Sequence, residues 1–226
     1  MSVSLPRGAL LTAAKDLRVE RHAKVALGQM LPFAILVLIL FAFALDPDRG
    51  VLNRATPGLF WLTVLFTSTL AVQRSFEIEV SDGALDGLRL SGISPSSVFL
   101  GKAIALMAQL LVLELFMAVG VAILYNQTFG GWVLLGTVTI LSTIGIAAAG
   151  ATYGVLVSRL RHSATLLPLL LLPLLAPVLI SATKGTEVAL GYEAGGGWSW
   201  AALLGVFALA YLILGMVLYH PLLEDS

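Results

Sequence analysis

The chain has 226 residues, of which 58% are hydrophobic and only 12% charged, and its formal net charge is zero. A soluble domain carries roughly 25% charged residues, so this composition, with several apolar runs of about 18 residues or more, predicts a helical polytopic membrane protein. The balanced charge gives no indication of a nucleic-acid partner, and the lack of cysteine excludes disulfides, thiolate catalysis and zinc–sulfur sites.

The first 24 residues are rich in basic side chains and precede the first apolar run. Leu10, Ala14 and Leu17 have helical spacing and share one face. This pattern predicts an amphipathic helix lying on an anionic leaflet, with an unstructured basic tail as the alternative.

Six apolar segments follow, each long enough to cross about 30 Å of hydrocarbon as a helix. The second begins at Pro57-Gly58, and the fifth is followed by a predicted Gly-rich loop at 184–197. A cleaved signal peptide is disfavoured, because the polar leader alone is as long as a whole signal sequence. The predicted spans cover residues 25–45, 56–73, 98–125, 132–157, 165–183 and 198–219, with a tail at 220–226.

The distribution of Lys and Arg predicts the orientation. With the N-terminus inside, ten of the 13 basic residues lie on the cytoplasmic side, and only Arg49, Arg54 and Lys184 lie on the other. The positive-inside rule then places both termini, and the polar loop at 74–97, in the cytoplasm.

This cytoplasmic loop contains the sequence DGALDGLRL, from Asp82 to Leu90. Leu85 and Leu88 can share one helical face, with Asp86 and Arg89 on the other. A short helix parallel to the membrane would suit a groove on a soluble partner. The alternative is a solvated loop whose leucines fold back onto the bundle. The loop's acidic residues, Glu77, Glu79, Asp82 and Asp86, add negative charge.

Two nearby patterns imitate enzyme motifs but lack required residues. The segment at 96–103, SSVFLGKA, has Ser96 where a phosphate-binding loop needs its first Gly, and Ala103 where it needs a hydroxyl for Mg²⁺. The Asp-Gly pairs of the cytoplasmic loop have the wrong spacing for a CDP-alcohol phosphotransferase. We therefore expect no catalytic activity from the chain alone.

Glu114 is the only carboxylate in the middle of a predicted span. A charge at that depth costs several kcal/mol, about 2.5–3.5 on insertion scales, so the side chain faces the interior or water, or is protonated. One interpretation is a polar point on a substrate path. The other is a protonated side chain bonded between helices, or one that reaches toward a span end.

Small and helix-breaking residues mark two later spans. Gly150 and Gly154 form a GxxxG pattern that permits close helix packing. Pro168, Pro173 and Pro177 each remove a backbone donor, which predicts either a helix that flexes or a static kink. The histidines, His22, His162 and His220, fall at the cytoplasmic edge without metal-ligand spacing, so no metal site is predicted.

Several short blocks between 55 and 183, in this order and spacing, resemble the haem exporter protein B family (cytochrome c maturation protein B), a membrane subunit of ABC-2 type exporters. The blocks are Pro57-Gly58 with Trp61; Leu70-Ala71, Arg74 and Phe76; Asp82-Gly83, Leu85, Leu88 and Leu90; Lys102; and Leu172-Pro173-Leu174, Pro177, Leu179 and Ile180.

The resemblance implies a six-helix ABC-2 permease fold in the bacterial inner membrane, with haem as the cargo. The implied partners are a separate ABC ATPase (cytochrome c maturation protein A), which holds ATP and Mg²⁺, the haem-handling membrane proteins C and D, and the haem chaperone, protein E. Two copies of this chain are expected. The residues implied to couple to the ATPase are Glu77, Asp82, Gly83, Leu85, Asp86, Leu88 and Arg89.

Other functions stay open on the residues alone. An ABC-2 permease for a lipid, glycan or drug would share every pattern described above. A membrane enzyme would need acids or histidines gathered at one depth, and a purely structural assembly factor would show no dependence on ATP.

Overall fold

The structure, a computed structural model, describes residues 4–23, 26–45, 49–81, 94–158 and 163–224, and places the side chains of 4–21, 28–45, 50–76, 94–156 and 170–219. All regular structure in these segments is helical. Five helices are long and apolar enough to cross a membrane. The prediction of an all-helical membrane protein is therefore confirmed for the described part of the chain.

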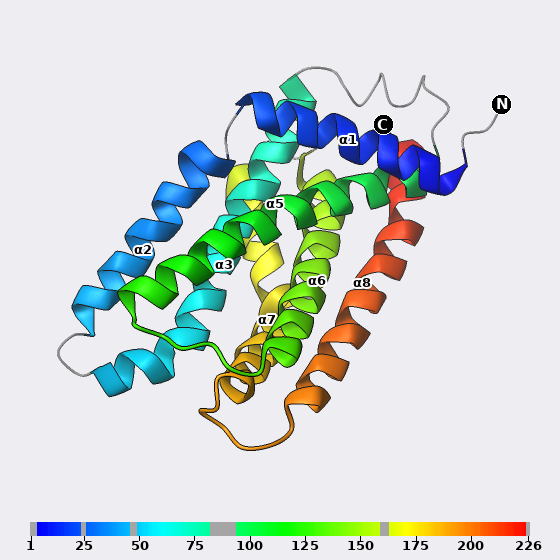
Figure 1. Ribbon diagram of the computed structural model, residues 1–226. Coiled ribbons are helices and arrows are strands. Elements are labelled where there is room, and N and C mark those ends of the chain that lie inside the picture. Colours follow the sequence, from blue (N-terminus) through cyan, green and yellow to red (C-terminus); the bar gives the residue numbers. More distant parts are fainter. Residues whose placement is uncertain (1–3, 24–25, 46–48, 82–93, 159–162, 225–226) are drawn as a thin grey trace.

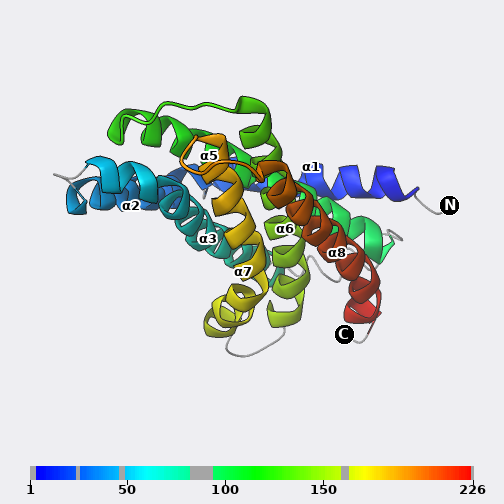
Figure 2. The same cartoon turned by 90° about the horizontal axis from the view of Figure 1, so that it is seen from below.

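The long helices pack side by side in a bundle. Seen from below, α2 and α8 lie at opposite sides of it, with α3, α6 and α7 between them (Figure 2). A π-helical turn, η1, leads into α2. The bounds are η1 (Ala26–Met30), α2 (Leu31–Ala44), α3 (Arg49–Ser81), α5 (Pro95–Leu124), α6 (Trp132–Ser158), α7 (Ser163–Ala189) and α8 (Gly197–Glu224).

The first predicted span, 25–45, is not among the five helices that are long and apolar enough to cross a membrane. It corresponds to the 5 residues of η1 and the 14 of α2, which together give about 28 Å of helix at 1.5 Å per residue. Its apolar part, Gly28–Ala44, is shorter than each of those five helices. α2 packs along α3 and α5 and so belongs to the same bundle.

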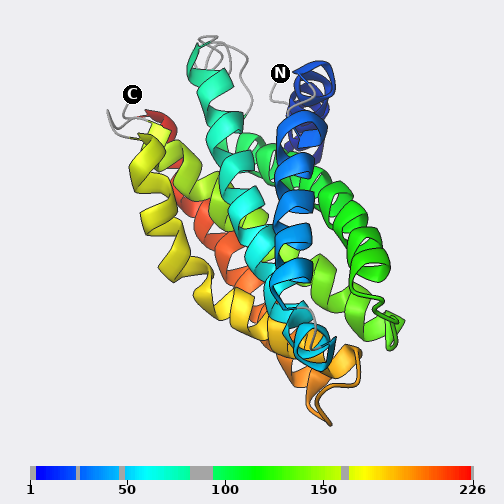
Figure 3. The ribbon, with the colours of Figure 1, turned by 90° about the vertical axis from the view of Figure 1, so that its left-hand side faces the viewer.

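One helix, α1 (Leu5–Ala23), runs across the end of the bundle and packs on α5 (Figure 1). From the side, the end of α3, the start of α5 and the end of α8 lie at this same end, which we call the α1 end (Figure 3). The end of α2, the start of α3, and the α5–α6 and α7–α8 connections lie at the opposite end, which we call the far end.

The face that α1 turns to the bundle consists of small residues. Ala9, Thr12 and Ala13 are buried, whereas Leu10 and Leu17 of the predicted apolar stripe are exposed. Small side chains allow α1 to approach α5 closely. The leucine stripe stays on the outside, where it is available to a membrane surface.

The polar loop predicted at 74–97 is shorter in the structure. α3 continues to Ser81 because Phe76 packs into the bundle and is only 4% exposed. α5 begins at Pro95, whose missing N–H costs nothing in the first helical turn. The Ser94 hydroxyl caps the helix by accepting a hydrogen bond from the Ser97 N–H at 3.4 Å.

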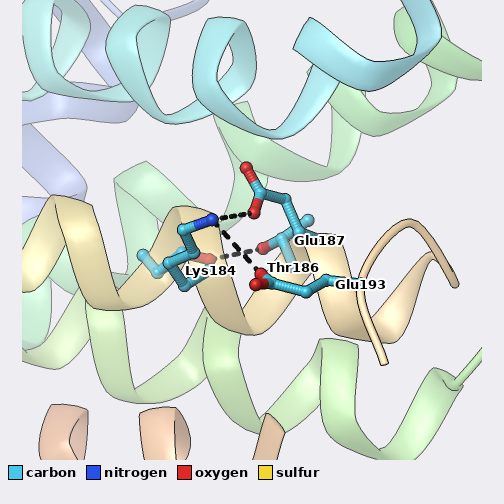
Figure 4. Close-up of polar contacts among 5 residues, drawn as sticks. Lys184, Thr186, Glu187 and Glu193 are labelled. Atoms are coloured by element: carbon cyan, nitrogen blue, oxygen red, sulfur yellow. Dashed lines mark hydrogen bonds and ion pairs between the residues drawn. The ribbon is translucent and has the colours of Figure 1, made fainter. Parts of the chain in front are cut away.

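The Gly-rich loop predicted to begin at residue 184 also begins later, because α7 continues to Ala189. The Lys184 ammonium lies 2.8 Å from the Glu187 carboxylate, one helical turn on, and 3.2 Å from that of Glu193 (Figure 4). The i, i+3 spacing of Lys184 and Glu187 suits an exposed helical face, so these charged residues do not end the helix as the sequence interpretation expected.

Near its start, α3 bends. Pro57 lies inside the helix, where its ring removes a backbone hydrogen bond, and the first turns lie at an angle to the rest (Figure 1). One turn later, Trp61 is buried and its indole Nε1 donates to the Thr186 hydroxyl of α7 at 2.9 Å. The bend thus turns α3 into the bundle where the second span was predicted to begin.

Candidate functional site

The predicted coupling residues fall largely outside the described residues. Asp82, Gly83, Leu85, Asp86, Leu88 and Arg89 all lie between Ser81, the last residue of α3, and Ser94, the cap of α5. Glu77 belongs to α3, but its side chain is outside the described set. What the structure does describe is how the two flanking helices are held.

The start of α5 is bound to α1 and α8. The Ser97 hydroxyl donates to the Leu5 carbonyl of α1 at 3.2 Å, and the Ser96 hydroxyl to the Met216 carbonyl of α8 at 3.4 Å. Phe99 of α5 packs against Gly215 of α8. A Cβ on Gly215 would lie only 2.1 Å from the Phe99 ring. Residues 82–90, which we call the predicted coupling segment, are thus followed by a helix whose start is held at a fixed position.

A buried lysine joins α5 to α1 and α3. Lys102 is 2% exposed, and its ammonium lies 3.6 Å from a carboxylate oxygen of Asp16 in α1. The same ammonium lies 4.7 Å from the centre of the Phe76 ring in α3, within cation–π range. A buried ammonium needs compensation of this kind, because removing it from water costs several kcal/mol.

Close packing at three glycines also holds α1 against α5 and α3 against α6. A Cβ on Gly101 would lie 2.5 Å from the Thr12 Cβ of α1, and one on Gly154 of α6 would lie 2.0 Å from the Phe76 ring. Gly150, one turn away, approaches Val72 of α3 in the same way. The GxxxG pattern of α6 therefore receives two side chains of α3.

We call Asp16, Phe76, Lys102 and Gly154 the α1 junction. It joins α1, α3, α5 and α6, and its residues Phe76 and Lys102 lie on the two helices that flank the predicted coupling segment. Because close-packed interiors transmit displacement instead of absorbing it, a shift at the end of α3 moves the neighbouring helices with it.

Glu114 lies much deeper. It is 2% exposed, and ten residues of α5 separate it from Leu124, which is about 15 Å of helix. Its two carboxyl oxygens lie 3.0 and 2.9 Å from the Thr143 hydroxyl of α6. That hydroxyl also lies 2.7 Å from the Thr139 carbonyl.

The single proton of the Thr143 hydroxyl can serve only one of these two neighbours. When it is donated to the Thr139 carbonyl, a protonated Glu114 satisfies the other contact by donating to the Thr143 oxygen. Glu114 thus bonds between two helices, as one of the sequence interpretations proposed. It also lines a cavity, as the other interpretation requires.

This lateral cavity has a volume of about 410 Å³ and lies in the half of the bundle toward the far end. Its deep residues, Trp61, Glu114 and Thr186, are nearly inaccessible. Its outer residues include Trp132 and Leu115, which are 68% and 66% exposed. The lining consists of Thr56, Pro57, Phe60, Trp61, Leu111, Glu114, Leu115, Ala118, Val121, Phe129, Trp132, Leu135, Gly136, Thr139, Ile140, Thr186 and Leu190.

The predicted prolines all lie in α7. Pro173 is exposed and Pro177 half-buried, while the side chain of Pro168 is outside the described set. Pro177 leaves the Pro173 carbonyl without its helical donor. The next carbonyl, that of Leu174, accepts a hydrogen bond from the Tyr211 hydroxyl of α8 at 2.6 Å. This bond ties the proline-containing part of α7 to α8.

No cluster of three metal-ligating side chains occurs among the described residues. The side chains of His22, His162 and His220 lie outside them.

Sequence reasoning missed the partners of Lys102 and the aromatic lining of the cavity. In the sequence, Lys102 belongs to a broken phosphate loop and to the blocks of the family resemblance. A lysine inside an apolar run is itself a signal for a buried partner, but the run does not tell that the partner is Asp16. The two residues are 86 positions apart and meet only because α1 folds across α5.

Comparison with known proteins now assigns the family. The model of the CcmB protein family matches residues 8–219, beyond the region 55–183 that carried the resemblance. The chain belongs to the CcmB protein family.

Curated relatives agree with this assignment, and each is named "Heme exporter protein B". The protein of Pseudomonas aeruginosa is 30% identical over 88% of this chain and 90% of its own length. That of Paracoccus denitrificans is 33% identical over 74% and 76%. That of Escherichia coli K12 is 30% identical over 77% and 79%.

Proposed function

We propose that this CcmB-family protein is the membrane subunit of an ABC-type haem export system that serves cytochrome c maturation. It works with a separate ATPase, cytochrome c maturation protein A, and the segment Asp82–Leu90 docks into that ATPase. The chain itself hydrolyses no ATP. Six spans cross the bacterial inner membrane, with both termini and the coupling segment in the cytoplasm.

The observation that carries this proposal is the α1 junction. The two helices that flank the coupling segment, α3 and α5, are joined to each other by Phe76 and Lys102, and to α1 by Asp16. A push on the segment therefore reaches four helices through buried contacts. This arrangement suits a subunit that receives work from a soluble partner.

Family membership favours haem over the other cargoes open to an ABC-2 permease, because the relatives carry haem in their name. We further propose that two copies assemble with two ATPases, and that cytochrome c maturation proteins C, D and E receive or hold the haem. Energy from ATP then moves haem or releases its chaperone.

The test is capture of the ATPase by the full-length protein in mild detergent. Replacing Leu85 and Leu88 with Asp places two charges on the apolar face of the docking helix, so capture should be lost. The matched control, Ser91→Asp, adds a charge in the same segment without removing an apolar side chain, and should retain capture.

Membrane insertion and elution volume should be the same for all three proteins. Retained capture by the Leu85/Leu88 variant would remove the docking assignment. Capture of an ATPase without any haem-binding membrane protein would keep the docking segment and favour another cargo.

A further inference from the structure

We infer that the lateral cavity is a binding site for a flat, largely apolar ring system with a hydrogen-bonding edge, the chemical class that includes haem. The inference rests on the proposed function for the identity of the ligand. The site itself stands on the geometry of α3, α5, α6 and α7. Its 410 Å³ lies within the range of about 300–1,000 Å³ typical of small-molecule sites.

The cavity opens on the surface formed by α5 and α6. Leu115, Trp132 and Ile140 line it and are 66%, 68% and 47% exposed. Exposed apolar side chains on membrane helices face lipid, so a ligand enters sideways from the hydrocarbon. A lipid-soluble molecule can take this route, whereas a small hydrophilic solute cannot.

Two pairs of aromatic rings line the cavity. The Phe60 and Trp61 ring centres are 5.5 Å apart on α3. Those of Phe129 and Trp132 are 5.7 Å apart at the start of α6. Aromatic surfaces favour flat π-systems, because offset and edge-to-face contacts add to the effect of burial. A lipid acyl chain would gain nothing specific from such rings.

The deep end of the cavity is polar. The Glu114 carboxyl lies there, and the Trp61 indole and Thr186 hydroxyl are already bonded to each other. Glu114 is therefore the group placed to bond to the edge of a ligand. Its partner Thr143 keeps the Thr139 carbonyl as an acceptor if Glu114 turns toward a ligand.

The lining contains no His, Met, Cys, Tyr or Lys among the described residues. The nitrogen and sulfur ligands usual for haem iron are thus missing from it. The ring and its edge, and not the metal, are what this cavity recognises. Metal-free protoporphyrin IX should therefore bind with an affinity similar to that of haem.

The experiment titrates haem and protoporphyrin IX, separately, into the full-length protein in phosphatidylcholine–phosphatidylglycerol nanodiscs. Absorbance and quenching of tryptophan fluorescence report binding, and empty nanodiscs give the lipid background. Gly136 lines the cavity, and a Cβ there meets nothing within 4 Å. Gly136→Leu should therefore fill the cavity without clash and weaken both ligands at least about tenfold, or 1.4 kcal/mol.

The matched control is Gly205→Leu in α8, where a Cβ meets only ordinary contact at 3.9 Å. It should bind as the unaltered protein does. Ala118→Phe fills the same cavity from α5 and serves as a second blocking variant if Gly136→Leu elutes abnormally. Glu114→Leu should weaken binding, and Glu114→Gln, which still donates a hydrogen bond, should restore most of it.

Equal affinity in the unaltered, Gly136→Leu and Gly205→Leu proteins would place the ligand elsewhere and overturn the inference. So would the absence of saturable binding above empty nanodiscs. Quenching of Trp61 by brominated acyl chains, measured in a variant whose other three tryptophans are Phe and without saturable porphyrin binding, would assign the cavity to lipid. Porphyrin binding by a protein that captures no ATPase would leave the site standing and remove the proposed function.

Discussion

The two ends of the bundle are built on opposite principles. At the α1 junction, a buried lysine, a carboxylate, an aromatic ring and a glycine meet in close contact. In the lateral cavity, aromatic and aliphatic side chains surround about 410 Å³ of open volume. Tight packing transmits displacement, whereas open volume with a polar group at its deep end provides room for a ligand.

This difference suggests that the α1 junction and the lateral cavity have different functions. The α1 end, nearest the proposed coupling segment, is closely packed and specific in its pairing. The far half is loosely filled and opens to the surface between α5 and α6. α3, α5 and α6 contribute to both regions, so the helices that we propose to be moved by the ATPase also form the cavity.

The largest effect is expected from Asp16→Ala, which takes a carboxylate away from buried Lys102. Removing one partner of a buried ion pair costs about 3–5 kcal/mol, and we expect the lower end because the Asp16 side chain is 13% exposed. Lys102→Met should cost less, because it keeps the apolar stem and leaves Asp16 beside Lys15 at 3.2 Å. Unfolding in mixed micelles measures both, and equal costs would contradict this account.

The next effect is at the α6–α3 contact. Gly154→Ala places a methyl group against the Phe76 ring, and such overpacking costs about 1–3 kcal/mol. Gly136→Ala, in the open cavity of the same helix, should cost nothing. In a Phe76→Ala background the penalty at Gly154 should disappear, and a persistent penalty would show that the strain lies elsewhere.

A smaller effect is expected from Trp61→Phe, which removes the hydrogen bond to Thr186. The loss should be about 1 kcal/mol, because the Thr186 hydroxyl still donates to the Ala182 carbonyl. Thermal unfolding in detergent would report it. Trp198→Phe, at a side chain that is 60% exposed, is the matched control and should leave the midpoint unchanged.

The smallest effect is expected from Lys184→Ala. Its ion pairs with Glu187 and Glu193 are short, but the lysine side chain is 41% exposed, and exposed pairs contribute little. No measurable change in the unfolding midpoint is expected. A clear loss would mean that these pairs hold the end of α7 and the loop beyond it.

Much of the architecture was predictable because the bilayer constrains helices so strongly. Apolar runs of sufficient length had to become helices, since every backbone group in hydrocarbon needs an internal partner. The predicted ends were less accurate where side chains found partners at a distance. Phe76 extends α3 beyond the predicted loop boundary, and α7 continues past Lys184 to Thr186, which bonds Trp61 of α3.

The sequence by itself determined the helical membrane class, the approximate spans, the family resemblance and the unusual position of Glu114, because these depend on local composition and spacing. Only the tertiary structure decided that Lys102 meets Asp16 and Phe76, that Gly154 receives the Phe76 ring, and that Glu114 lines a cavity with two aromatic pairs. Such contacts join residues on different helices, and helical periodicity specifies a face but not the neighbour that covers it.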